Sequence, residues 1–454
     1  MKKKIELVAP GGSLGKIEYA YHFGADAVYV GHPSFSLRAR INKFTEKKLG
    51  KAVKLARKAG KRIYFTLNIY THERHLETLE KHLKFIKKVR PDAIIASDPG
   101  IINLAMKILR GPTARSKRNA DGPPRIHLST QANTTNSEAA RFWEKQGVSR
   151  IILAREVTLP EIKKIRKACP KMELEYFVHG AMCMSYSGRC LLSRWLESRS
   201  ANLGDCVQPC RWPYRITHNV KPCLPAGRRG TQGNKEEIIL SEDQHGTYFL
   251  NSKDLCLIEY LDKLSEAGIN SFKIEGRTKS AYYVAIATKA YRQVLDAISS
   301  EKSRTEIKKI SAEAKKELGK LVNRGYSTGF LFGKGGWEND FDHSHKVNQF
   351  QFVGETCPVK SRQRRVSDKV GEFNRVKIHN ALRPGEKVEI ITPDKIYSDK
   401  VLEIRRADGE KVKSAHGGSK NIFWVKFEKN FPEKSLVRKK LPNWKRSGIV
   451  KAEK

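Results

Sequence analysis

The amino-acid sequence predicts an α/β protein: a (β/α)8 TIM-like barrel with a cysteine-rich insertion between strands 7 and 8, followed by a small C-terminal antiparallel β-barrel. Eight short β-rich apolar runs alternate with eight segments of helical period before residue 300. Such alternation is typical of right-handed βαβ units around a parallel sheet, and eight units close a barrel. Beyond residue 346 the helical period disappears, and short alternating runs separated by turns replace it.

The predicted barrel strands are the eight apolar runs Ile5–Ala9, Ala27–Gly31, Ile63–Asn68, Ala93–Ser97, Ile126–Thr130, Arg150–Ala154, Leu174–His179 and Ser271–Glu275. The predicted helices that alternate with them are Leu14–Phe23, Glu46–Ala59, Leu76–Lys88, Ile101–Leu109, Glu138–Gln146, Leu159–Ala168, Leu257–Ala267 and Ser280–Ser299. The first turn lacks the G-x-G-x-x-G spacing of a dinucleotide-binding sheet. We therefore interpret Gly11, Gly12 and Gly15 as loop glycines.

These patterns divide the chain into three parts. The barrel spans residues 1–336 and includes an insertion at 180–256, far longer than an ordinary loop and therefore expected to be functional. The small β-barrel spans residues 346–440, where we expect RNA to bind, and a basic tail follows at 441–454. The predicted strands of the small β-barrel are Val376–His379, Lys387–Ile391, Val401–Ile404 and Ile422–Phe427. Pro- and Gly-rich stretches at 111–124 and 222–238 indicate surface insertions.

Charge is the strongest bulk signal. The chain carries 88 Lys and Arg against 48 Asp and Glu, a formal net charge of +40. A field of that sign attracts polyanions, so we expect RNA as a partner, although a solvated lysine-rich surface would explain the same count. No apolar run is long enough to span a bilayer. Glu6 and Pro10 interrupt the N-terminus before any signal-peptide core. We expect no membrane association and a cytoplasmic location.

Eight cysteines stand at 169, 183, 190, 206, 210, 223, 256 and 357. In a reducing cytosol, clustered cysteines are more often metal ligands or catalytic groups than disulfides. Structural zinc pairs its cysteines in close knuckles, and only Cys206 and Cys210 have that spacing. Scattered thiolates favour an iron–sulfur cluster, while zinc and no metal remain open alternatives. A thiol-protease dyad of Cys183 and His179 is a weaker alternative.

Polar side chains gather at the carboxyl ends of the predicted strands, where barrel enzymes place their working residues. We expect three of them to act in acid–base catalysis: Glu156, His179 and Glu275. Six others are expected to bind substrate, the arginines by holding a carboxylate or phosphate: Arg38, Arg40, Asn68, Gln131, Arg155 and Arg277. The pairs Arg155–Glu156 and Glu275–Arg277 could instead be structural ion pairs at the rim.

Five segments carry a resemblance to a known family: Glu6–Gly12, Gly24–Gly31, His127–Asn133, Phe177–Cys190 and Phe272–Arg277. They resemble the U-32 peptidase family of collagenase-like proteases, and within it the branch that hydroxylates tRNA. The likeness runs from about residue 4 to residue 333, and the region after 345 looks like that family's C-terminal β-barrel domain. The insertions at 111–124 and 222–238 depart from the family pattern.

The resemblance implies a 4Fe–4S cluster on Cys183, Cys190, Cys206 and Cys256, with Cys210 as a second candidate ligand. It also implies RNA modification, with prephenate as co-substrate and 5-hydroxyuridine at the tRNA wobble position as product. The barrel arginines would bind this small dicarboxylate, the basic β-module and tail would grip RNA, and a redox partner could serve the cluster. The competing hypotheses are a collagenase-like hydrolase, which no H-E-x-x-H or G-x-S-x-G motif supports, and a noncatalytic RNA-binding factor.

Overall fold

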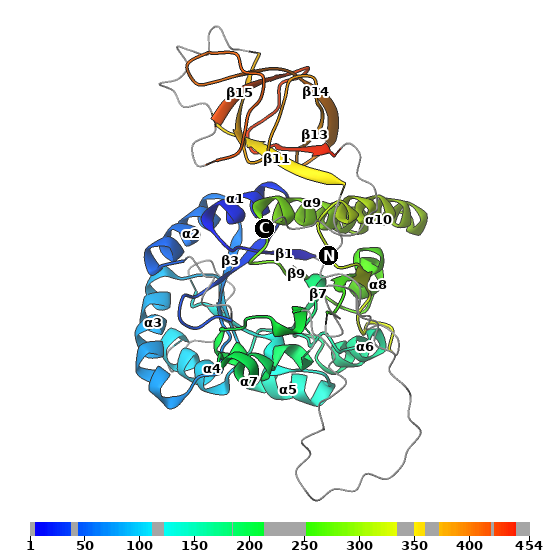
Figure 1. The fold of residues 1–454 in the computed structure, drawn as a ribbon. Coiled ribbons are helices and arrows are strands. Elements are labelled where there is room, and N and C mark those ends of the chain that lie inside the picture. The colour runs from blue at the N-terminus through cyan, green and yellow to red at the C-terminus, as the bar shows by residue number, and fades with distance from the viewer. Residues whose placement is uncertain are drawn as a thin grey trace, which may run out of the picture.

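The structure is a computed structural model of the chain. It describes residues 5–37, 44–110, 122–183, 185–212, 251–333, 349–358, 372–418 and 422–441. Among these residues, the helices are too short or too polar for any of them to cross a bilayer. Two bodies make up the fold, a large ring of strands and helices and a smaller β-barrel beside it (Figure 1).

The larger body is a closed parallel barrel with helices around its outside (Figure 1). Its strands are β1 (Glu6–Pro10), β2 (Ala27–Gly31), β3 (Arg62–Leu67), β4 (Ala93–Ala96), β5 (Arg125–Leu128), β6 (Arg150–Ile152), β7 (Glu173–Ala181) and β9 (Ser271–Ile274). Strand β9 pairs in parallel with both β7 and β1, which closes the ring. The predicted eight-stranded barrel is confirmed.

Most of the outer helices bury an apolar face against the barrel, and several begin at a side chain that caps the first turn. Their bounds are α1 (Leu14–His22), α2 (Glu46–Lys58), α3 (Leu76–Val89), α4 (Pro99–Ala105), α5 (Ser137–Lys145), α6 (Leu159–Ala168), α8 (Leu261–Glu266), α9 (Ala281–Ser299) and α10 (Arg304–Gly319). In α2, Leu49, Ala52, Val53 and Ala56 repeat at helical spacing and are all buried, while Thr45 caps the first turn. Helix α10 was not among the predicted helices.

Two short strands, β8 (Asp254–Cys256) and β10 (Tyr326–Ser327), lie outside the eight-stranded ring. Strand β7 is longer than its neighbours, and its last residues pair antiparallel with β8, so that Cys256 lies opposite His179. We expected Cys256 at the start of a helix, and this is wrong. The chain pairs with β7 first, and α8 begins only at Leu261.

The barrel interior contains a buried ion-pair network. Arg150 of β6 is 2% exposed, bonds to Glu173 and Glu175 at 2.8 Å each, and also pairs with Glu6 of β1. Lys273 of β9 donates to Glu175 at 2.7 Å. A buried charge without a partner is costly. The network therefore ties β1, β6, β7 and β9 together from inside the ring.

The smaller body is a closed antiparallel barrel of order β11-β12-β15-β14-β13-β16. The strands are β11 (Phe350–Thr356), β12 (Asn374–Ile378), β13 (Lys387–Ile391), β14 (Ile396–Arg405), β15 (Ile422–Phe427) and β16 (Leu436–Lys440). Alternate residues such as Val376, Ile390 and Val437 point inward and form its core. The predicted small β-barrel is confirmed, although β11 and β16 were not predicted as strands.

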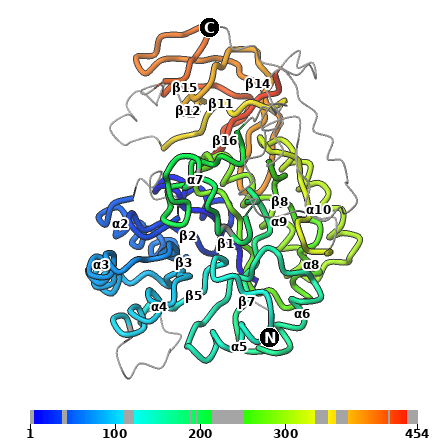
Figure 2. Tube along the Cα trace, turned by 60° about the horizontal axis from the view of Figure 1, so that its bottom comes forward, coloured from blue at the N-terminus to red at the C-terminus, as the bar shows by residue number. Residues whose placement is uncertain are grey.

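The β-barrel lies against α9 and α10 in both views (Figure 1, Figure 2). Arg438 of β16 is fully buried at this junction, where its guanidinium bonds at 2.6 Å to Glu317 of α10 and to Glu389 of β13. The neighbouring Lys439 pairs with Glu386 at 2.8 Å. These two cations are therefore used inside the protein, and the RNA binding expected of the β-barrel and the tail stays a prediction. The tail from residue 442 onward lies outside the described residues.

We expect Arg438→Met to lower the free energy of unfolding by about 3 kcal/mol, the lower end of the cost of breaking a buried ion pair. Lys320 remains beside both Glu317 and Glu389 and limits the loss. Urea unfolding of the full chain measures the change. The exposed Arg406, paired with Glu410, gives the matched control, for which Arg406→Met should change stability by less than about 1 kcal/mol. Equal effects of the two variants would contradict the assigned junction.

Candidate active site

A cavity of about 480 Å³ opens at the carboxyl ends of the barrel strands. Its barrel side includes Tyr29 of β2, Thr66 of β3, Phe177 of β7 and Lys273 of β9. The chain that follows β7 covers the other side, from Ala181 to Arg211. A parallel barrel places its reactive residues at this end, and the volume lies within the range of small-molecule sites.

Four cysteines line this one cavity: Cys183, Cys190, Cys206 and Cys210. They come from the segment that contains helix α7 (Leu192–Glu197) and three short 3-10 turns. Cys183 is exposed, and the other three are half-buried. Burial, followed by the nearby Cys183, raises the pKa of Cys210 to about 11. The thiols are thus close enough to influence one another.

Hydrogen-bond donors surround the sulfurs. The backbone N–H of Leu192 donates to Cys190 Sγ at 3.4 Å, and that of Gln208 donates to Cys206 Sγ at 3.3 Å. The Ser193 hydroxyl also donates to Cys206 Sγ, at 3.6 Å. Such donors stabilise thiolate charge, and they are one of the means by which proteins tune iron–sulfur clusters. The segment is therefore arranged to hold anionic sulfur.

The spacing of the sulfurs distinguishes between metal centres. A single tetrahedral zinc, with Zn–S bonds of about 2.3 Å, would hold its sulfurs about 3.8 Å apart. Within the described residues, however, no three cysteine sulfurs lie within 4.8 Å of one another. A four-iron cluster binds its thiolates at four separate corners and so needs a wider arrangement. Among the described residues, the cysteines of the cavity are therefore not already gathered around one tetrahedral ion.

Cys256 and His179 are not among the described residues that line the cavity. Cys256 is buried in β8, with its sulfur 3.8 Å from the Tyr291 hydroxyl. His179 is 2% exposed and packs against Tyr283, Tyr291 and Tyr326. Burial lowers the pKa of His179 to about 4, so its ring is neutral at physiological pH.

These placements set two predicted site residues apart from the cavity wall. His179 is buried among aromatic side chains. The fourth cysteine that lines the cavity is Cys210, while the roles expected of His179 and Cys256 stay predictions. Sequence spacing could not show that Cys256 lies outside the cavity wall. Its position is set by the pairing of β8 with β7, which places Cys256 opposite His179, and His179 lies four residues before Cys183 in the chain.

The structure does bring together five of the predicted polar residues: Asn68, Gln131, Arg155, Glu275 and Arg277 all line the cavity. The guanidinium of Arg277 donates to the Thr66 hydroxyl at 3.0 Å and to the Leu37 carbonyl. That of Arg155 lies 4.0 Å from the centre of the Phe177 ring. Arg38 and Arg40 lie outside the described residues.

Glu156 has a different place from the predicted one. It is not among the described residues of the cavity wall. Instead its carboxylate accepts bonds from the backbone N–H and the hydroxyl of Ser187, at 2.6 and 2.7 Å. Ser187 has a φ of 45°, which is costly for a residue with a side chain. Glu156 thus holds the strained turn between Cys183 and Cys190 and is a positioning residue.

Two basic residues of the cavity, Arg189 and Lys273, were missed by sequence reasoning, and Arg211 also lines it. Arg189 donates to the Tyr70 hydroxyl at 2.9 Å and so fastens the cysteine segment to the barrel. Lys273 could have been found, since period-two alternation places it on the same strand face as Glu275. With Arg155 and Arg277, five basic side chains line the cavity beside one carboxylate, Glu275. Lys273 is already paired with Glu175, so the excess of arginines over carboxylates in the cavity wall favours an anionic ligand.

Gly12 offers a test of how the Arg277 backbone is held. A Cβ added at Gly12 would lie 2.0 Å from the Arg277 carbonyl oxygen, whereas one at Gly15 would meet nothing within 4 Å. We expect Gly12→Ala to cost about 1–3 kcal/mol in the free energy of unfolding and to displace Arg277. Gly15→Ala, inside α1, should be neutral or stabilise by up to about 1 kcal/mol. Denaturant unfolding of both variants measures this, and equal stabilities would refute the close approach.

Comparisons with known proteins agree with this architecture. The family model described as peptidase family U32 matches residues 12–340, and that of the U32 C-terminal domain matches residues 349–438. tRNA hydroxylation protein P of Haemophilus influenzae is 35% identical over 92% of this chain and 93% of its own. The 23S rRNA 5-hydroxycytidine C2501 synthase of Escherichia coli is 35% identical over 66% of this chain and 40% of its own.

A relative with a different name matches over a similar length. A collagenase of Porphyromonas gingivalis is 29% identical over 95% of this chain and 97% of its own. The two family models together span both bodies of the fold. They confirm the resemblance that the motifs predicted. The chain belongs to peptidase family U32.

Proposed function

We propose that the chain hydroxylates RNA, and that its substrate is the wobble uridine of tRNA, converted to 5-hydroxyuridine with prephenate as co-substrate. One observation carries the proposal: four cysteines and five basic side chains face the same cavity at the mouth of the barrel. The names of two relatives, a tRNA hydroxylation protein and an rRNA hydroxycytidine synthase, support RNA as the substrate class. The net charge of +40 suits a polyanionic substrate.

In this proposal Cys183, Cys190, Cys206 and Cys210 would hold a 4Fe–4S cluster. When bound, such a cluster supplies electron-transfer chemistry that side chains lack. The protein's part is to orient the sulfurs. Glu156 fixes the turn between the first two cysteines, and Arg189 ties that segment to Tyr70 of the barrel. A redox partner would exchange electrons with the site at its exposed side, where Cys183 lies.

The basic side chains would bind the small dicarboxylate. A guanidinium can hold a carboxylate with two parallel hydrogen bonds. Arg277 is set in place by Thr66 and Leu37, and Arg155 by the Phe177 ring. Arg155 follows β6 and Arg277 follows β9, and these two strands pair with β7 on either side. The two guanidiniums would each hold one carboxylate of the ligand.

Glu275 would exchange a proton with the substrate. It accepts a hydrogen bond of 2.9 Å from the Tyr29 hydroxyl. Burial first, and then the charge of Glu275, raise the pKa of Tyr29 well above its usual value, so Tyr29 stays a donor. A carboxylate held this way can accept a base N–H or remove a proton. The uridine would leave its stack to reach the cavity, as in other enzymes that modify bases.

Nucleoside mass spectrometry of tRNA tests the proposal. A strain that lacks the gene should lose a hydroxylated uridine, and the wild-type gene should restore it. Glu275→Gln keeps the shape of the side chain and should slow restoration about 10²- to 10⁴-fold. The exposed Glu197 of α7 gives the control Glu197→Gln, which should restore fully.

An unchanged nucleoside profile in the deletion strain would reject the proposal. The competing function is collagen cleavage, which the name of one relative suggests. Cleavage of collagen by the purified protein, retained after Glu275→Gln and without iron, would favour that function. The proposed substrate places the reaction in the cytoplasm.

A further inference from the structure

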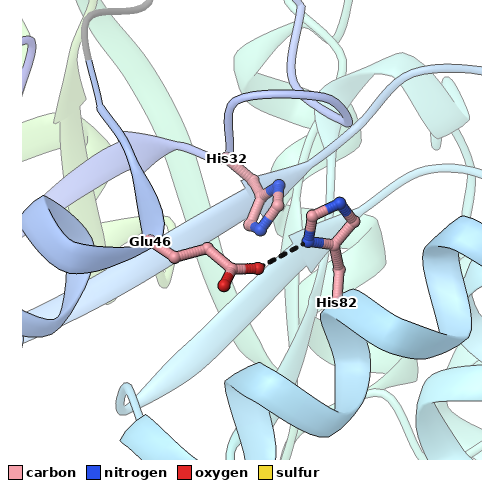
Figure 3. A group of neighbouring side chains, drawn as sticks. All are labelled: His32, Glu46 and His82. Atoms are coloured by element: carbon pink, nitrogen blue, oxygen red, sulfur yellow. Dashed lines mark hydrogen bonds and ion pairs between the residues drawn. The ribbon is translucent and has the colours of Figure 1, made fainter.

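His32, Glu46 and His82 form a second cluster of potential metal ligands, apart from the cysteines (Figure 3). His32 follows β2, Glu46 opens α2, and His82 lies in the middle of α3. One ligand atom of each lies within 4.8 Å of those of the other two. Glu46 Oε1 is 2.9 Å from His82 Nδ1, and the two imidazole rings are 4.3 Å apart between centres. Three elements distant in sequence thus bring two imidazoles and a carboxylate together.

His32 is the unusual member of this cluster. Its side chain is fully buried, and neither ring nitrogen has a hydrogen-bond partner within the described part of the chain. A buried polar group without a partner costs about 1–3 kcal/mol, and one reason for such a group in a native protein is an ion that it binds. In Figure 3 the ring of His32 faces the carboxylate of Glu46 and the ring of His82. The Glu46–His82 ion pair accounts for the proximity of those two side chains. It does not account for the burial of the His32 ring, whose nitrogens have no partner among the described residues.

We propose that His32, Glu46 and His82 bind one divalent transition-metal ion, of which zinc is the reference. Imidazole nitrogen with one carboxylate suits zinc, iron, nickel or copper, whereas calcium and magnesium prefer oxygen alone. Two histidines and one glutamate also make up a recurrent three-ligand zinc set, with a water as the fourth ligand.

The geometry requires only a small closure around the ion. Metal–ligand bonds of about 2.0–2.1 Å would hold neighbouring ligand atoms about 3.4 Å apart. Glu46 and His82 keep 47% and 19% of their side chains exposed, so they can rotate toward the buried ring. The backbone of His32 is fixed, because its N–H donates to Thr66 and its carbonyl accepts from Ser36 Oγ at 2.8 Å. The entrance for the ion lies on the side of Glu46.

The ion would stabilise the fold around the cavity and would not contact the reacting atoms. None of its three ligands is among the described residues that line the cavity. The chain that follows His32 is described as far as Leu37, whose carbonyl accepts from Arg277 and whose N–H donates to Asn68 at 3.1 Å. The ion would tie this segment to α2 and α3, and so hold one wall of the cavity. The inference does not depend on which RNA the protein modifies.

Metal binding by the full-length protein tests the proposal. Cysteine thiolates in general also bind zinc, so the titration uses Co²⁺, whose thiolate complexes absorb strongly in the near ultraviolet while nitrogen and oxygen sites do not. After chelation, wild-type protein should take up one Co²⁺ ion per chain without that thiolate band. Glu46→Gln and His82→Ala should each weaken this binding about 100-fold or more. Glu77→Gln, an exposed carboxylate on the same helix α3, is the matched control and should bind as wild type.

Unfolding in the presence of chelator separates metal binding from folding. The melting temperatures of both ligand variants should then lie within a few degrees of that of chelated wild type. When Co²⁺ is added, only the melting temperatures of wild type and Glu77→Gln should rise. Equal Co²⁺ affinity in Glu46→Gln, His82→Ala and wild type would overturn the proposal. So would Co²⁺ uptake that shows only the thiolate band, because the ion would then reside on the cysteines.

Discussion

Replacing Cys210 with serine is expected to remove the iron from the anaerobically purified protein, whereas replacing Cys256 with serine should leave it bound. Cys210 shares the cavity with Cys183, Cys190 and Cys206, and Cys256 is buried beside Tyr291. Wild type and Cys256→Ser should carry about four irons per chain and the brown colour of a cluster. In Cys210→Ser the cluster loses one of four ligands, so iron should fall well below that value. Iron and acid-labile sulfide analysis measures the difference.

Stability has to be separated from ligation in this comparison. Cys256 is only 6% exposed, so its replacement is expected to cost some stability without changing iron content. Cys357→Ser, in the loop after β11, is the control for a cysteine far from the cavity. Loss of iron in Cys256→Ser with retention in Cys210→Ser would reverse the assignment and restore the ligand set that sequence similarity implies.

Arg150→Met should be among the most destabilising substitutions in the barrel. It removes one cation from contact with Glu6, Glu173 and Glu175, two of which are almost fully buried. Lys273 stays beside Glu175, and Arg62 stays 2.8 Å from Glu6. Breaking a buried ion pair from one side costs about 3–5 kcal/mol, because the remaining charge is left without compensation. Equilibrium unfolding in denaturant measures the loss.

The network also makes a prediction about pH. Burial alone would raise the pKa of Glu6, but the charges of Arg150 and Arg62 outweigh it and lower the pKa from 4.5 to about 2. A lowered carboxyl pKa stabilises the fold above pH 4.5 and loses that effect as the pH falls toward 2. A shift of this size is worth about 3 kcal/mol. The difference in stability between wild type and Arg150→Met should therefore shrink across this window.

A second substitution supplies the internal control. Glu6→Gln in the Arg150→Met background removes one of the buried carboxylates that have lost Arg150, so the double variant should be more stable than additivity of the single variants allows. Strict additivity of the two substitutions, or a loss from Arg150→Met below about 1 kcal/mol, would show that the network contributes little to the fold.

Sequence periodicity was sufficient to predict the barrel strands and the helices between them, but not α10, β11 or β16. The eight barrel strands and the helices between them follow from the alternation of β-rich and helical runs, as in Leu49, Ala52, Val53 and Ala56 of α2. The predicted polar mouth also follows from topology, because the carboxyl ends of parallel strands meet at one end of a barrel. This argument placed Arg155, Glu275 and Arg277 correctly in one cavity.

The same reasoning failed for residues whose position depends on pairing or packing between segments distant in sequence. The ring places the carboxyl ends of its strands together, but β7 runs on to pair with β8, and this leaves His179 in the core. Arg438 looks like a surface cation in sequence and is buried only because β16 docks against α10. The partnership of His32 with His82 likewise has no local signal, since it arises from the packing of a loop against α3.

One reaction tests most directly whether the cysteine-lined cavity hydroxylates tRNA, and it is run under anaerobic conditions. Chelator-treated protein is divided in two, and one half is reconstituted with iron and sulfide. Both halves receive tRNA from the deletion strain, prephenate, and extract of the deletion strain as the source of the redox partner and electron acceptor. We expect the hydroxylated uridine to form with the reconstituted half alone. Equal formation by the iron-free half, or none by either half while collagen is cleaved, would contradict hydroxylation at the cysteine-lined cavity.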